Sequence, residues 1–406
     1  MKKHYWFLII SLPLFVLGIY IYKDAHIILE TSKKQNFVKQ QGITTTGYDN
    51  GKKVFKINID ELKQNDYRHI LFSKHVTDGI VYASNGAAII QNITGSQGRI
   101  NTQIKSIVIT KNVTALITPE KTTKNIRIQS NKFRYSHHNQ ISEFTDHASL
   151  FIETTKISSK EFYFYTEANE IKFLAPLQIL TATSETNAKK AFIQLDADQL
   201  LASKNIKTIY KPSNNESYSQ QIQELTKSPT TISADELELK YHLPETPTVI
   251  YRKNILITQP QKSLIADQVT LDFFKNNYQA TGKIKFNFDD LRWLKNKDRT
   301  YKNKKLKSLL SKSTSIQTET ATFKRESNIL TLKNNVKIKQ KTFQLSCDEF
   351  MFNFNTDIIT ASGNVIIKKL GLEHLSSDLL IIDVKNETFQ SGARQKLTEI
   401  TLDIID

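Results

Sequence analysis

The sequence contains one cysteine, Cys347, among 406 residues, together with only 12 glycines and 8 prolines. A single cysteine cannot form an internal disulfide, so the chain is not a small disulfide-stabilised scaffold. The low glycine and proline content excludes a collagen-like or glycine-rich fibrous protein. Hydrophobic residues make up 39% of the chain and charged residues 24%, a balance typical of folded proteins. We therefore expect a folded chain long enough for two or three domains.

The sequence also lacks the common nucleotide-binding and hydrolase motifs. No G-x-x-x-x-G-K-[ST] phosphate loop is present, because Gly282-Lys283 is followed by Ile284. No G-x-S-x-G motif is present to expose a serine nucleophile. We therefore expect a protein that is not an enzyme and binds no cofactor, and any energy from nucleotide hydrolysis would have to come from another chain.

Histidine and cysteine are placed poorly for catalysis or metal binding. His137 and His138 are adjacent, and neighbours on a strand point to opposite faces, so they cannot readily share one metal ion. Cys347 precedes Asp348 and Glu349, whose negative charges would raise the pKa of its thiol. We predict neither a metal site nor a catalytic thiol.

Positive charge is in excess, because Lys and Arg outnumber Asp and Glu by 16. Such an excess favours an anionic partner, such as a phosphate-bearing lipid, a membrane surface or a nucleic acid. The sign of the partner's charge is indicated, but its identity is not.

Residues 5–22 form an uncharged, strongly apolar run that follows Lys2 and Lys3. Eighteen residues in a helix span roughly 27 Å, about one hydrocarbon core, so we predict a membrane helix with its N-terminus in the cytoplasm. A cleaved signal peptide is the competing interpretation, although its apolar region is usually shorter and ends at small residues. The residues expected to anchor or kink this helix are Tyr5, Trp6, Pro13, Tyr20 and Tyr22.

Most of the remaining chain alternates apolar and polar residues with a period of two. This alternation is typical of strands with one buried face and one solvent-exposed face, so we predict an all-β protein. The clearest apolar rows contain Phe55, Ile57, Ile59, Val269, Leu271, Phe273, Ile284, Phe286, Phe288, Phe350, Phe352, Phe354, Leu380, Ile382 and Val384.

A pattern of two strands joined by a turn recurs at a nearly fixed spacing. Asp235 and Asp267 are 32 residues apart, and Glu319, Asp348 and Asp378 follow at intervals of 29 and 30 residues. A period near 30 indicates strand pairs that cannot bury their apolar faces alone and must stack on their neighbours. We predict a stacked β-structure with a continuous apolar interior.

The repeats and the composition suggest a division of the chain. We assign residues 1–23 to a cytoplasmic tip and membrane helix, 24–185 to a first β-domain and 186–231 to a boundary region with a polar, linker-like stretch. Residues 232–400 form a second β-domain, interrupted by a basic insertion at 289–313. We therefore expect two consecutive arrays of strands.

The insertion at residues 289–313 carries nine Lys or Arg residues and several leucines at loosely helical spacing. These features allow a basic amphipathic helix. Two interpretations stay open: the leucines pack on the sheet, or the helix contacts anionic headgroups. The leucines are Leu291, Leu294, Leu306, Leu309 and Leu310.

The repeats resemble a known family. The segments ADQ…YQATGKIKF (266–286) and CDEF…ITASGNVIIK (347–368) resemble the OstA-like (LptA-like) strand pairs of the lipopolysaccharide-transport bridge proteins. The apolar run followed by GYDNGKKVFKINIDE (47–61) and GSQGRINTQIKSIVITKNVTALI (95–117) resembles LptC, the bitopic member of that system. Together the two similarities cover most of residues 5–400.

The resemblance implies a twisted β-jellyroll with an open, apolar interior. It implies an inner-membrane anchor with a single membrane pass, a periplasmic location, and contact with an inner-membrane ABC transporter complex. It also implies head-to-tail joining to other OstA-like jellyroll proteins by strand addition, with lipopolysaccharide or a related glycolipid as ligand and no nucleic acid. This chain departs from the usual bitopic member, which is about half as long, because a second array follows the first.

Elementary energetics supports a carrier of this kind. Each buried methylene is worth ~0.8 kcal/mol, so exposing a twelve-carbon chain to water would cost on the order of 9 kcal/mol. An apolar strip along stacked strands lowers that cost while sugars and phosphates stay in water. The candidate groove residues are Phe55, Ile57, Ile59, Val269, Phe273, Ile284, Phe286, Phe350, Phe352 and Val365.

Two other functions fit the same pattern. A structural or adhesive β-solenoid would have an interior packed by its own side chains. An enzyme acting on polysaccharide would need clustered acids, for which Asp235, Asp267, Asp348 and Asp378 are candidates because they recur at equivalent positions. We favour a role for these acids in turns and strand starts.

Overall fold

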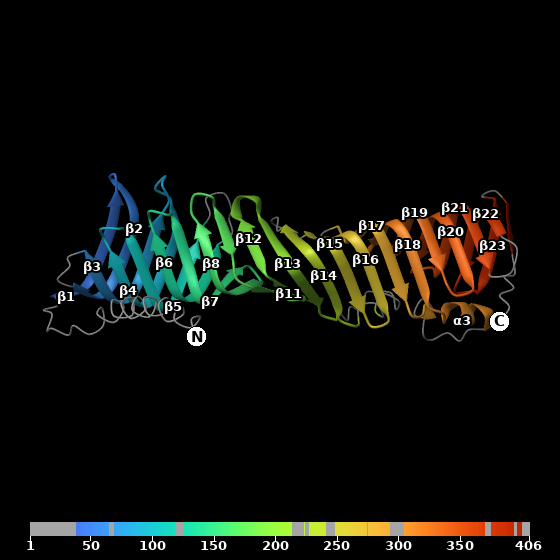
Figure 1. Ribbon diagram of the computed structural model, residues 1–406, viewed down its shortest axis with the longest axis horizontal. Coiled ribbons are helices and arrows are strands. Elements are labelled where there is room, and N and C mark those ends of the chain that lie inside the picture. Colours follow the sequence, from blue (N-terminus) through green and yellow to red (C-terminus); the bar gives the residue numbers. More distant parts are fainter. Residues whose placement is uncertain are drawn as a thin grey trace, which may run out of the picture.

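The computed structural model describes residues 38–64, 69–118, 125–212, 223, 227–240, 248–273, 275–292, 304–369, 375–393 and 396–399. The strands in these ranges belong to a single antiparallel sheet of 24 strands, arranged in a long row (Figure 1). Strands that are consecutive in the chain pair with one another, except among the four short strands between residues 170 and 194. The chain is therefore all-β over the described residues, with short helical segments between strands.

The N-terminal part of the sheet, β1 to β13, ends at Tyr210. Its strands are β1 (Val38–Asp49), β2 (Lys52–Gln64), β3 (Ile70–Tyr82), β4 (Ala88–Asn101), β5 (Ser106–Ile117), β6 (Ile126–Ser136), β7 (Ile141–Ile152), β8 (Thr155–Tyr165), β9 (Glu170–Phe173), β10 (Leu177–Leu180), β11 (Ser184–Ala188), β12 (Lys190–Gln194) and β13 (Gln199–Tyr210), with the short 3-10 helix η1 (Leu195–Ala197).

The C-terminal part, β14 to β24, begins at Thr230. Its elements are β14 (Thr230–Lys240), β15 (Thr248–Gln259), β16 (Lys262–Asp272), β17 (Asn277–Phe288), the helix α3 (Lys304–Leu310), β18 (Thr314–Lys324), β19 (Ile329–Lys339), β20 (Phe343–Asn353), β21 (Ile358–Lys369), β22 (Leu375–Asp383), β23 (Thr388–Ala393) and β24 (Lys396–Glu399). The predicted 30-residue repeat is one pair of adjacent strands.

The fold class expected from the sequence is corrected in two respects, of which the first concerns the membrane helix. Among the described residues, no helix is long and apolar enough to cross a membrane. The run at residues 5–22 lies outside the described residues, as do its expected anchors Tyr5, Trp6, Pro13, Tyr20 and Tyr22. A run of eighteen residues is near the lower limit for a span, so hydropathy alone did not establish that helix.

The second correction concerns the two consecutive arrays. Strand β13 pairs with β14 along its whole length, from Gln199 with Lys240 to Tyr210 with Thr230. The backbone hydrogen bonds therefore continue through the region where a boundary was expected, and the strands form one sheet. The limits proposed for the domains stay a prediction.

Most long strands are interrupted near the middle by a bulge. On β15 the ladder steps from Arg252 to Ile255 while the partner strand β16 steps only from Gln268 to Ala266. The two residues of the bulge, Lys253 and Asn254, lie opposite Asp267 alone and have left-handed backbone angles, with φ of 64° and 51°. A bulge of this kind bends the strand and increases its twist. Equivalent left-handed pairs are Lys111-Asn112, Asp146-His147, Lys204-Asn205 and Asn334-Asn335. We call the line of these bulges the corner.

The recurring acids lie opposite the bulges. Asn254 Nδ2 donates to Asp235 Oδ2 over 2.6 Å, and Asn364 Nδ2 donates to Asp348 Oδ2 over 2.8 Å. On the intervening repeat, the backbone N–H of Lys283 donates to Asp267 Oδ2 over 3.0 Å. These acids therefore lie in the middle of strands and satisfy polar groups of the bend, instead of marking turns or strand starts. The expected spacing is explained by one bend for every pair of strands.

Glycine is required at the corner of β17. Gly282 has φ of +97°, and a Cβ there would collide with the Asp267 carboxylate. We predict that Gly282→Ala destabilises the protein by about 1–3 kcal/mol, because it combines strain with a steric clash. Gly42→Ala is the matched control, since Gly42 also has positive φ but has open space around its Cβ position. Urea unfolding of both variants measures the difference, and equal destabilisation would contradict this description of the corner.

Candidate functional site

The bend at the corner brings the two ends of each strand onto one cavity. Phe343 and Phe352 lie at opposite ends of β20, nine residues apart, and would be about 30 Å apart in a straight strand. Both nevertheless line the same cavity of about 110 Å³. The sheet is therefore folded along the corner into two walls whose apolar faces oppose one another.

One row of inward-facing side chains runs along the corner from strand to strand. The register pairs Phe133 with Phe144 and Phe144 with Phe162, whereas further along it pairs Val269 with Ala280 and Ala280 with Ala321. We call this series the corner row. Large aromatic side chains thus fill the corner of the N-terminal part, and smaller ones occupy the equivalent positions of β16 to β18.

The N-terminal part has a closed interior. The rings of Phe133, Phe144, Phe162 and Phe173 form a continuous stack with centroid separations of 5.0, 5.0 and 5.4 Å. Burial there extends to the strand ends, since Tyr135, close to the end of β6, is only 1% exposed. This part is packed by its own side chains.

The interior of the C-terminal part is more open. On β16, Ala266 and Val269 next to the corner are buried, but Leu264 and Leu271 towards the strand ends are only partly buried. On β17 the same contrast separates Ile284, which is buried, from Phe286 and Phe288. We call this partly exposed apolar surface between the walls of β15 to β20 the trough.

A cavity of about 110 Å³ lies at the far end of the trough, and we call it the chamber. Leu310 of α3 packs with Phe352, Phe354 and Phe389 of the sheet and its turns. Leu309 and Leu310 line the chamber together with these aromatic residues. Figure 1 shows α3 lying along one long edge of the strands β18 to β23. The helix therefore covers the chamber between the two walls.

This arrangement distinguishes the two interpretations of the basic insertion. Leu291, Leu309 and Leu310 pack against the apolar interior, as the first interpretation predicted. The side chains of Leu294 and Leu306 lie outside the described part of the chain.

The predicted groove residues fall into three environments. Phe55, Ile57 and Ile59 are fully buried in the closed N-terminal part. Val269, Ile284 and Val365 are buried beside the corner of the C-terminal part. The last group faces the trough or chamber: Phe273, Phe286 and Phe350 are partly buried there, and Phe352 lines the chamber at 2% exposed.

Sequence reasoning missed several residues of the trough and chamber. Leu264, Leu330 and Phe343 contribute to this surface. Leu264 and Phe343 lie near strand starts, where the alternation is too short to recognise. Gln340 was missed because a glutamine in a turn carries no signal of a cavity until the fold encloses it.

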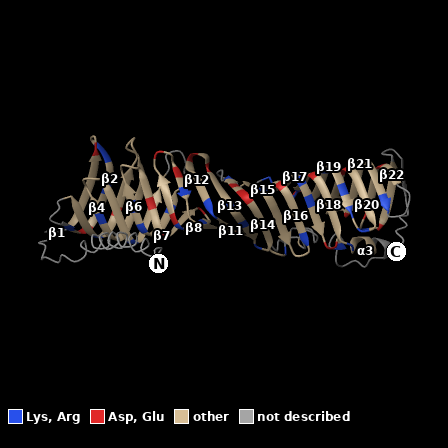
Figure 2. Cartoon of the chain, in the orientation of Figure 1, with Lys and Arg blue, Asp and Glu red and all other residues tan. Residues whose placement is uncertain are grey.

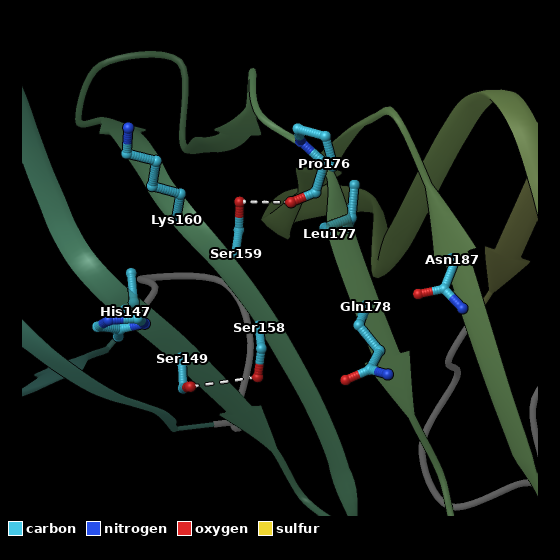
Figure 3. Close-up of a pocket in the computed structure, with 10 residues that line it drawn as sticks. His147, Ser149, Ser158, Ser159, Lys160, Pro176, Leu177, Gln178 and Asn187 are labelled. Carbon is cyan, nitrogen blue, oxygen red and sulfur yellow. Dashed lines mark hydrogen bonds between the residues drawn. The ribbon is translucent and has the colours of Figure 1, made fainter.

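A second hollow, of about 590 Å³, lies at the corner of β7, β8 and β10, where Pro176 interrupts the strand between β9 and β10 (Figure 3). Its walls are mostly polar: Ser149 and Ser158 share a hydrogen bond of 3.2 Å, and Ser159 Oγ donates to the Pro176 carbonyl over 3.0 Å. Ser158 and Gln178 alternate with buried residues of the core, so they belong to the outward face of the sheet. This hollow is separate from the trough.

Charged side chains of both signs occur along the whole length of the sheet. Figure 2 shows Lys and Arg interspersed with Asp and Glu from the N-terminal to the C-terminal strands. At the junction of the two parts, Glu238 is paired with Arg252 at 2.6 Å and with Lys240 at 3.1 Å. The contact with Arg252 joins β14 to β15, whereas Lys240 lies on the same strand as Glu238.

Comparisons with known proteins assign neither a family nor a function to this chain. No family model matches the chain, and no curated protein matches it. One matching solved structure is that of LptH, the LptA-homologous periplasmic component of the lipopolysaccharide transport device of Pseudomonas aeruginosa. The chain is 16% identical to it with a TM-score of 0.25, and the match covers 36% of this chain and 87% of that one. At this TM-score the likeness assigns neither a family nor a function.

The burial of Cys347 offers a test of the interior of the C-terminal part. Burial, reinforced by Asp348 and Glu349, raises the pKa of the Cys347 thiol to about 12, and the side chain is buried. At pH 8 the reactive thiolate should therefore be scarce and inaccessible. We expect iodoacetamide to label the native protein at least about 100-fold more slowly than the urea-unfolded protein. Comparable labelling rates, followed by mass spectrometry, would contradict this packing.

Proposed function

We propose that this protein is a non-enzymatic carrier that holds the acyl chains of a glycolipid in the trough. The observation that carries the proposal is the partial exposure of inward-facing apolar side chains along consecutive strands, including Leu264, Leu271 and Phe286. Apolar side chains that face the interior of a sheet are normally covered by the opposite layer. Here they form a continuous strip to which an extended hydrocarbon chain is the complementary ligand.

The corner row gives the trough its depth. Small side chains at the floor leave more room for a ligand, and the floor at β16 to β18 is made by Val269, Ala280 and Ala321. The four stacked phenylalanines occupy that space in the N-terminal part. We therefore assign ligand binding to the C-terminal part and a spacing or docking role to the N-terminal part.

We further propose that the carrier acts in the periplasm, in lipopolysaccharide transport from the inner to the outer membrane. The sequence resemblance to the bridge proteins of that system supports this role, and lipopolysaccharide or a related glycolipid is then the ligand. An ATP-driven inner-membrane transporter is the proposed energy source, because the chain has no phosphate-binding loop of its own.

The ends of the sheet are the proposed joints to other bridge proteins. Within the described part of the chain, β1 pairs only with β2 and β24 pairs only with β23. An edge strand presents free backbone N–H and C=O groups and can receive a strand from another chain. Joining through these edges would extend the sheet without any additional binding surface.

The closed interior of the N-terminal part favours the second candidate function, a structural solenoid, for that part alone. Phe55, Phe133 and Phe144 are all 0% exposed, so their side chains present no surface to a ligand. The two candidates therefore make different predictions for the two parts of the sheet.

Photo-crosslinking distinguishes them. We expect a photoreactive amino acid at position 273, in the trough, to form adducts with glycolipid in cells, and one at position 144, in the closed part, to form none. Adding Ala280→Leu to the position 273 variant should reduce the adducts several-fold, because the larger side chain raises the floor of the trough. Gel mobility and mass spectrometry identify the adducts. Silence at both positions in folded protein would favour the structural solenoid.

Depletion of the protein tests the transport role. If the chain carries glycolipid across the periplasm, newly made glycolipid should accumulate at the inner membrane as the protein is lost. Pulse labelling followed by separation of the membranes measures this distribution, and re-expression of the protein serves as the control. Unchanged delivery to the outer membrane after depletion would contradict the proposed function.

A further inference from the structure

The chamber contains one polar side chain with an unsatisfied acceptor. Gln340 lines the chamber and is only 7% exposed. Its Nε2 donates to the Leu309 carbonyl over 3.0 Å and to Thr314 Oγ1 over 2.8 Å. Its Oε1 is buried and has no hydrogen-bond partner among the described residues.

The orientation of this amide follows from its partners. The Leu309 carbonyl can only accept a hydrogen bond, so the atom facing it must be the Gln340 nitrogen. Thr314 Oγ1 donates to the Lys312 carbonyl over 3.0 Å and is thereby free to accept from the same nitrogen. Gln340 Oε1 is therefore the unpaired atom of the amide, because the contact with the Leu309 carbonyl alone fixes which side is the nitrogen.

A buried acceptor without a partner is costly in an apolar cavity, and few native groups are left in this state. The other residues lining the chamber are Phe, Leu and Ile, none of which can donate a hydrogen bond from its side chain. No side chain among the described residues of the chamber supplies a donor for Gln340 Oε1, so an occupant of the chamber can supply it.

We propose that the chamber receives the part of an acyl chain that carries a hydrogen-bond donor, an O–H or an amide N–H, and that Gln340 Oε1 accepts from it. This inference rests on the proposed carrier function and specifies the ligand's chemistry. The chamber would then select chains with such a donor over plain hydrocarbon chains of equal length.

The size of the chamber fits a segment of a chain rather than a whole lipid. A volume of about 110 Å³ holds roughly four water-sized groups, at about 30 Å³ each. The remainder of a longer chain would lie along the trough, which continues from the chamber through Phe288, a residue that lines both. The donor therefore needs to lie on the few atoms that enter the chamber.

Competition binding to the purified full chain tests the inference. The hydroxyl arm compares dodecanoic acid with 3-hydroxy- and 12-hydroxydodecanoic acid, and the amide arm compares N-decanoylglycine with the ester O-decanoylglycolate. We expect at least one probe with a donor to bind roughly five- to tenfold more tightly than its partner without one. Which arm shows the preference identifies the source of the donor.

Two variants provide the matched controls. Gln340→Leu removes the acceptor and should abolish the preference while still binding dodecanoic acid. Thr314→Val removes one contact of Gln340 Nε2 but keeps Oε1, so it should retain the preference. If Gln340→Leu does not fold, Gln340→Met replaces it. The comparison of probes with and without a donor on the wild-type protein does not depend on either variant.

The outcomes separate this inference from the carrier function. Equal affinities within both arms for the wild type would show that a water molecule serves the acceptor and would overturn the inference. A preference that survives in Gln340→Leu would also overturn it. Failure of every probe to bind would instead contradict the carrier function itself.

Discussion

The architecture depends on the bend in the middle of each long strand. A straight strand of twelve residues presents one apolar face that must be covered by another layer. Two left-handed residues on one strand, opposite a single residue on the next, fold the strand back so that the sheet covers itself. The polar groups exposed by the bend are satisfied by the recurring acids, as when Asn335 Nδ2 donates to Glu319 Oε1 over 2.6 Å. A single sheet thereby provides both layers of its own core.

The same bend produces two different interiors, because the side chains along the corner row differ in size. Four stacked phenylalanines fill the corner of strands β6 to β9 in the N-terminal part. Where Ala280 and Ala321 replace them, less apolar volume is available to fill the space between the walls. The walls of the C-terminal part are kept apart by the backbone bend, and their outer side chains stay partly exposed. A partly exposed apolar surface thus arises from smaller residues on an unchanged backbone plan.

Much of the fold could be predicted from the sequence, because a period of two assigns side chains to faces directly. Val269 and Ile284 were placed on the inner face by alternation alone, and they are buried there. The spacing of Asp235 and Asp267 gave the strand-pair repeat, but their function at the bulge could not be recognised without the partner strand. The distinction between closed and open interiors depends on volumes summed over two walls. The alternation near Phe55 and near Phe286 is the same, so it could not predict that the first lies in a closed interior and the second in an open one.

The continuity of the sheet links the two parts mechanically. Strands β13 and β14 are paired over their full length, and Glu238 ties them further, since Gln199 Nε2 on β13 donates to Glu238 Oε1 over 2.6 Å. A backbone ladder of this kind resists bending between the parts far better than a flexible linker would. The rigid, closed part can therefore fix the position and direction of the open trough relative to whatever binds the other end of the sheet. The proposed carrier requires such alignment on the β24 side of the sheet, where its trough lies, because an apolar chain crosses a gap in water only where two troughs meet end to end.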